Sequence, residues 1–150
     1  MSKRLPVYNF ADVPKETKLH QGRMTRYSIR TKHAQLVFAT IKPQPKNEQK
    51  YHRAPHDHPY DMMLVVVKGA MHMEIGNEIY DLPEGSAVVI PAFVMHRGYA
   101  KGDQPVQIME VFAPARADYI HLVDYQKEDF GDKGVPWVKK ELDSWNPPPA

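Results

Sequence analysis

The sequence predicts an all-β protein, built as a sandwich or barrel of short strands. Apolar or alternating runs recur at spacings of about 8–12 residues, each bounded by turn-forming residues. The chain contains 14 prolines, which favour turns and short strands over long helices. Its 150 residues fit a single domain, 1–150, with a sizeable core.

Alternating or continuous apolar residues mark the expected strands along the chain. In order, these are residues 7–10, 26–31, 33–43, 62–67, 70–75, 79–82, 87–91, 96–100 and 106–114. The run MMLVVV is apolar throughout, which predicts a strand buried on both faces. The expected barrel core spans about 33–113, after an irregular arm (1–25) and before an irregular or helical tail (115–150).

The tail shows no strand alternation. Tyr119, Leu122 and Val123 lie near helical spacing and favour a short helix, and residues 134–145 can add one or two helical turns.

Composition excludes several classes of protein. The net charge is +2 and no basic stripe is interleaved with aromatic residues, so we expect no nucleic-acid partner. There is no cysteine, which rules out disulfides and thiolate metal sites. No signal peptide and no apolar run of membrane-spanning length is present, so we expect a cytoplasmic protein that does not contact membranes.

Three histidines form the candidate metal site. His56 and His58 are separated by one residue, so in an extended strand their side chains lie on the same face. Two imidazoles at that spacing can converge on one metal ion, and His96 follows the downstream run GSAVVIPAFVM. The pattern predicts one divalent metal held by His56, His58 and His96. Its identity stays open among Fe, Mn, Zn, Ni, Co and Cu.

These residues resemble the two sequence motifs of the cupin superfamily, whose fold is a double-stranded β-helix barrel. The first motif places a glutamate and then a glycine after H-x-H, and this chain supplies His56, His58 and Gly69. The second motif is matched at Gly85, Pro91 and His96. The resemblance covers about residues 33 to 113.

The chain departs from both motifs at four positions. The glutamate ligand of the first motif falls on Met62, or on Met63 with the longer spacing. The other motif positions that differ are Lys50, Phe93 and Ala100. Because a thioether is a soft ligand, we expect Met62 to line the pocket as packing.

The closing segment VFAPARADYI is similar to that of small cupins of the uronate-ketonising type, where Pro-x-Arg-x-x-Tyr is common. Those cupins use a glutamine ligand that is missing here.

Three further side chains are candidates for catalytic roles. Asp61 can replace the missing glutamate if Pro59 curves the chain, although in a regular strand it faces away from the metal. His52 shares strand parity with the histidine pair and can serve in acid–base chemistry, or lie at a solvated rim. Arg97 can hold a substrate carboxylate, or face the other side of its strand.

We therefore expect a metal-dependent cupin enzyme, acting on a small oxygenated, anionic substrate as a dioxygenase or an enol/keto isomerase or lyase. A non-catalytic cupin that binds a sugar or small carboxylic acid is the alternative. We also expect a homodimer, in which the N-terminal strand pairs across subunits and covers a sheet edge.

Overall fold

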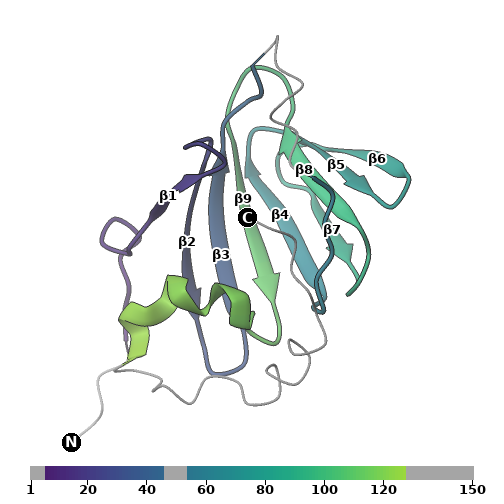
Figure 1. Cartoon of the computed structure of the whole chain (residues 1–150). Coiled ribbons are helices and arrows are strands. Elements are labelled where there is room, and N and C mark those ends of the chain that lie inside the picture. The colour runs from purple at the N-terminus through teal and green to yellow at the C-terminus, as the bar shows by residue number, and fades with distance from the viewer. Residues whose placement is uncertain (1–5, 46–53, 128–150) are drawn as a thin grey trace, which may run out of the picture.

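Two antiparallel β-sheets pack around one core in the computed structural model, which describes residues 6–45 and 54–127 (Figure 1). Nine strands and one 3₁₀-helix are defined in these ranges. They are β1 (Glu16–Leu19), β2 (Met24–Arg30), β3 (Gln35–Ile41), β4 (Met62–Lys68), β5 (Met71–Ile75), β6 (Glu78–Leu82), β7 (Ala87–Ile90), β8 (His96–Ala100), β9 (Val106–Phe112) and η2 (Ala117–Gln126). The arrangement is the double-stranded β-helix barrel that the resemblance implies.

The larger sheet has the strand order β1-β2-β3-β9-β4-β7, and the smaller has the order β6-β5-β8. Strand β9 lies between β3 and β4, so the last strand of the barrel joins its first and middle portions. Alternate residues of β2 and β3 face the core, as the pleat requires. The buried cluster draws Val37 and Leu64 from the large sheet and Met71 from the small one, so the two sheets share one core.

The outer face of β4 differs from the expectation for its apolar run. Leu64 and Val66 are buried, but Met63 is 45% exposed and Val67 is 51% exposed. The prediction that both faces are covered is therefore wrong for the single chain. Periodicity could not show this, because apolar residues occupy the outward positions as well.

The N-terminal region also differs from its prediction. Residues 7–10 form no strand; instead the Phe10 ring packs 4.7 Å from the ring of Phe38 and 5.5 Å from that of Tyr27. The expected irregular arm contains β1, which pairs with β2 of the same chain and forms one edge of the large sheet (Figure 1). Its four residues, ETKL, carry no apolar alternation, so periodicity does not predict a strand there.

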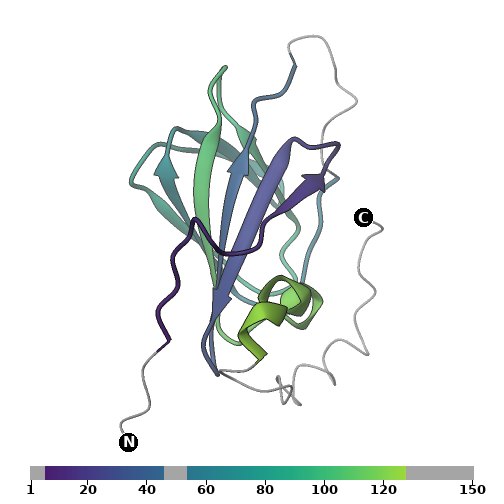
Figure 2. The ribbon, with the colours of Figure 1, turned by 90° about the vertical axis from the view of Figure 1, so that its left-hand side faces the viewer.

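Helix η2 lies at one end of the large sheet and contacts β2 (Figure 2). The buried Gln126 side chain fixes it there: its Oε1 accepts a hydrogen bond from Arg30 N (2.8 Å), and its Nε2 donates to Arg30 O (3.1 Å). Two further residues of η2, Leu122 and Val123, are also buried. The expected short helix is thus present in 3₁₀ form, whereas residues 134–145 lie outside the described residues.

Candidate metal centre

A backbone bridge brings the candidate ligands together. His56 pairs with His96 in an isolated antiparallel bridge, in which each backbone N donates to the other's carbonyl oxygen at 2.9 and 2.8 Å. His96 begins β8. His56 precedes β4 and is an isolated bridge residue, not part of a strand. The one-residue spacing of His56 and His58 therefore predicts their proximity correctly. A bridge to His96, and not a regular strand, holds His56 in position.

The three imidazoles converge. One ring nitrogen from each of His56, His58 and His96 lies within 4.8 Å of the others. Ring centroids are 4.5 Å apart for His56 and His96, 4.8 Å for His58 and His96, and 6.0 Å for His56 and His58. Nitrogens that each sit about 2.0–2.1 Å from one ion must be less than roughly 4.2 Å apart, so a modest inward shift permits binding.

His58 is set up to present one nitrogen to a cation. Only 1% of the residue is exposed. Its Nδ1 lies 2.9 Å from Tyr60 O, which fixes the tautomer in which Nδ1–H donates and Nε2 carries the lone pair. That Nε2 is buried and has no hydrogen-bond partner among the described residues. A buried, unsatisfied nitrogen aimed at two other imidazoles is what a metal would satisfy.

The charge state of His58 suits the same role. Burial lowers the pKa of His58 to about 3, and the positive charge of Arg116 and the neighbouring His96 add to this lowering. His58 is consequently neutral at physiological pH, as metal ligation requires.

His96 is oriented in the same manner. Its Nδ1 lies 2.7 Å from Val94 O, so the lone pair is on Nε2, and the residue is 3% exposed. Backbone carbonyls two residues away thus set both buried rings.

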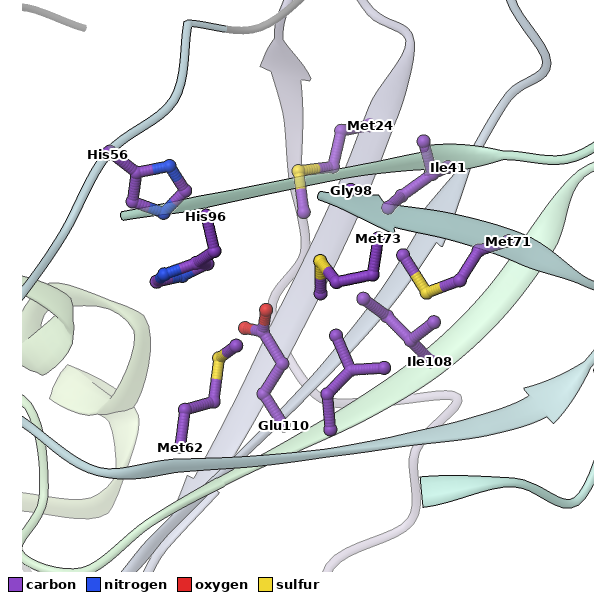
Figure 3. Close-up of a pocket in the computed structure, with 11 residues that line it drawn as sticks. Met24, Ile41, His56, Met62, Met71, Met73, His96, Gly98, Ile108 and Glu110 are labelled. Carbon is purple, nitrogen blue, oxygen red and sulfur yellow. The ribbon is translucent and has the colours of Figure 1, made fainter. Parts of the chain in front are cut away.

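His56 and His96 open onto a small pocket inside the barrel (Figure 3). Its cavity volume is about 20 Å³, so the flexible side chains of the wall must move aside to admit more than a water-sized group. Its lining residues come from both sheets and are Met24, Ile41, His56, Met62, Leu64, Met71, Met73, His96, Gly98, Ile108 and Glu110. Met62 is 2% exposed and belongs to this wall, as expected from the sequence.

Glu110 is the polar pocket residue that sequence reasoning missed. It lies on β9 between the buried residues Ile108 and Phe112, and Figure 3 shows its carboxylate directed towards His96 and Met62. It is outside the group of three convergent histidines. The available signal was its position in an inward-facing register on an apolar strand, where a carboxylate is unusual.

Two predicted catalytic residues lie elsewhere. Asp61 is exposed, and its Oδ1 accepts a hydrogen bond from Ala92 N (2.9 Å) on the loop after β7. Arg97 donates from Nε (2.5 Å) and a terminal nitrogen (3.0 Å) to the Glu74 carboxylate on the neighbouring strand. Neither is among the described residues that line the pocket, and the catalytic roles of both stay predictions. His52, the third of these residues, lies outside the described residues.

The Pro-x-Arg-x-x-Tyr segment builds a buried cation behind the site. Arg116 is 3% exposed, and its guanidinium lies 3.8 Å from the Tyr119 ring centroid and 4.9 Å from that of Phe112. Its Nε donates to Asp118 at 2.9 Å, and a second contact makes the pair bidentate. Arg116 therefore supports the barrel end and helps keep His58 neutral, and it is not among the described residues that line the pocket.

Comparison with known proteins agrees with this architecture. The chain is similar in structure to an RmlC-like cupin from Shewanella frigidimarina (18% identity, TM-score 0.63, covering 79% of this chain and 99% of that one). It is also similar to KdgF from Halomonas sp. (21% identity, TM-score 0.62, 77% and 98% covered). A third neighbour is the Fe(II) form of HppE (18% identity, TM-score 0.60, 75% and 62% covered). No curated protein matches the sequence.

At these identities the neighbours establish the fold alone. The family match is made on sequence: the cupin domain family covers residues 38–112, half of the chain, including all three histidines. The chain belongs to the cupin family.

Proposed function

We propose that this cupin is a metal-dependent enzyme that acts on a small, oxygenated, anionic substrate. One divalent ion is held by His56, His58 and His96. The main support for this proposal is that the three ring nitrogens converge within 4.8 Å. In addition, the buried Nε2 of His58 has no hydrogen-bond partner among the described residues.

The ligand set determines what the site would do. Three neutral imidazoles cancel none of the charge of a divalent ion and leave open coordination positions, and the Glu110 carboxylate lies nearby without belonging to the ligand group. Such an ion can polarise a carbonyl, lower the pKa of bound water or, as Fe(II), activate dioxygen. The charge favours an anionic, chelating substrate over a neutral one.

The chain itself contributes orientation, exclusion of water and one further polar group. Backbone carbonyls fix the rings of His58 and His96. The apolar wall keeps water from the substrate body. The Glu110 carboxylate lines the same pocket and can accept a hydrogen bond or a proton from a substrate hydroxyl or enol.

Metal analysis of the purified protein tests the centre. We expect about one equivalent of divalent metal, and its loss in His58→Ala. The matched control is His33→Ala, which removes an exposed histidine between β2 and β3. Absence of bound metal after metal supplementation, or full retention in His58→Ala, would contradict the proposal.

A second assay, oxygen consumption on turnover, distinguishes the possible reaction types. We propose oxygenation, or an enol/keto isomerisation or lyase reaction. Support for a metal enzyme comes from a similar fold, that of the epoxidase HppE, which is solved in an Fe(II) form among others. Oxygen consumption on turnover identifies an oxygenase, and product without oxygen uptake identifies the isomerase or lyase. Ligand-dependent stabilisation with no product would indicate a non-catalytic binding protein.

We further propose a homodimer. The sheet surface at β4 and β7 exposes Met63, Val67 and Val89, the last to 63%. Adjacent apolar residues of this kind favour burial in an interface. Sedimentation of the wild type and of Val67→Lys tests this: a dimer that dissociates in the variant supports it, and a wild-type monomer refutes it.

A cytoplasmic location stays a prediction. No helix in residues 6–45 and 54–127 is long and apolar enough to span a membrane.

A further inference from the structure

We propose that the substrate of this site has one chelating oxygen-bearing head and a short aliphatic body, and that the pocket rejects sugars and polyhydroxylated acids. This inference rests on the proposed metal-dependent function and specifies its substrate class. It comes from the composition of the pocket wall, which is divided between a polar end and an apolar end.

The apolar end is built almost entirely from methionine and branched aliphatic side chains. In Figure 3, Met24, Met71 and Met73 gather on the side of the pocket away from His56. Among the described residues, the apolar wall consists of Met24, Ile41, Met62, Leu64, Met71, Met73 and Ile108. Thioether chains are flexible and polarisable, so they adapt to a hydrocarbon body rather than to a fixed hydrogen-bonding pattern.

The polar end provides few hydrogen-bonding groups. The polar side chains of the wall are His56, His96 and Glu110, and the histidines are committed to the metal. The described wall contains no serine, threonine, asparagine, glutamine, lysine or arginine. A sugar acid would bury several hydroxyl groups against thioethers and methyl groups. Each hydroxyl left without a partner weakens binding by roughly tenfold or more.

Glu110 adds a restriction on charge. Its carboxylate stands next to the histidine end, where the substrate head would bind. A second carboxylate on the substrate would meet like charge there, which disfavours dicarboxylic acids. A monoanionic head with a hydroxyl or enol can bind the metal and also donate a hydrogen bond to Glu110.

Gly98 leaves space for the ends of Met71 and Met73, which line the apolar end of the pocket. A Cβ at this position would lie 2.5 Å from Met71 Cε and 3.1 Å from Met73 Sδ. Both atoms belong to the ends of flexible side chains, so Gly98→Ala can fold by displacing them. Because both methionines line the pocket, their displacement would narrow it at the apolar end while leaving the histidines in place.

Calorimetric titration of the metal-replete protein with three 2-hydroxy acids tests the inference. Lactate carries the head alone, 2-hydroxy-4-methylpentanoate adds an aliphatic body, and gluconate adds a polyhydroxylated body. We expect the aliphatic acid to bind at least about 100-fold more tightly than gluconate. We also expect Gly98→Ala to weaken the aliphatic acid about tenfold or more, with lactate affinity and metal content unchanged.

A pair of isosteric variants controls for the chemistry of the wall. Met73→Gln introduces an amide into the pocket and should reduce the preference for the aliphatic acid. Met63→Gln makes the same change on the outer face of β4, where the side chain is 45% exposed, and should not.

The outcomes separate the two proposals. If gluconate binds as tightly as the aliphatic acid, or if neither binds to metal-replete protein, the substrate inference is overturned and the metal centre stands. If the protein takes up no metal, the proposed function fails and the inference fails with it.

Discussion

Stability of the metal-free protein should fall in mild acid because of His58. Burial lowers the pKa of His58 to about 3, whereas in the unfolded chain the pKa has its ordinary value of 6.5. Between these two values the unfolded state binds a proton at this residue and the native state does not. Stability rises with pH wherever the unfolded state binds more protons, so this contribution is complete above pH 6.5 and is lost as the pH falls towards 3.

The magnitude follows from the same two values. A single group changes stability by at most about 1.4 kcal/mol per pH unit. Lowering the pH from 6.5 to 4.5 should therefore cost about 2 kcal/mol through His58 alone. Urea unfolding of chelator-treated protein at several pH values in this interval measures the loss.

His58→Gln separates this effect from the acidic side chains, whose titration is common to both proteins. The variant should lose about 2 kcal/mol less than the wild type over the same interval. His33→Gln, an exposed position, should keep the wild-type slope. Parallel pH profiles for wild type and His58→Gln would show that native His58 protonates normally, and the account of a buried neutral ligand would be wrong.

Three further substitutions have defined expectations. Phe93→Gly should raise the melting temperature, because Phe93 holds φ at +61° and is 63% exposed, so about 1 kcal/mol of backbone strain is relieved with little lost contact; a lower melting temperature would contradict this. Gly69→Ala should destabilise more than Gly102→Ala in urea unfolding: both have positive φ, but the new Cβ meets a backbone oxygen at 2.8 Å only at Gly69. Equal losses would rule out the clash. Arg116→Met should lower the free energy of unfolding by about 3 kcal/mol, because it leaves the Asp118 carboxylate without its partner. Arg116→Met/Asp118→Asn should recover part of this loss, and no recovery would assign the loss to the aromatic contacts of Arg116 instead.

The sequence predicted the elements whose periodicity and turn residues agree. Strands β2 to β9 follow apolar alternation or apolar runs, and the hairpin after Ile75 follows its glycine. The histidine cluster was accessible for the same reason: one residue separates His56 from His58, and the position of His96 in a second motif signals where the chain returns. Such local rules fix where a side chain points without knowledge of distant contacts.

What the sequence could not provide depends on long-range packing. Strand β1 exists because β2 offers a free edge, although its own residues are polar. Asp61 was a reasonable candidate by position, yet the loop after β7 supplies the Ala92 N–H that holds its carboxylate outside. Glu110 reaches the pocket only because β9 inserts between β3 and β4, a pairing of residues far apart in the chain.

The replacement of the motif glutamate by Met62 has a consequence that can be measured. Met62 begins β4, is 2% exposed and lines the pocket with His56 and His96. Met62→Glu would place a carboxylate beside the centre and neutralise part of the ion's charge. We expect the variant to bind divalent metal more tightly and lactate more weakly than the wild type, since the anion would then meet a smaller net charge.

Met62→Gln is the matched control, because it has the same length and polarity without the charge. It should leave lactate affinity within a few-fold of the wild type, which metal titration and calorimetry measure on the same preparations. If Met62→Glu tightened metal binding and left lactate affinity unchanged, charge at the centre would not govern anion binding. A small substrate would then be held mainly by its contacts with the wall and Glu110.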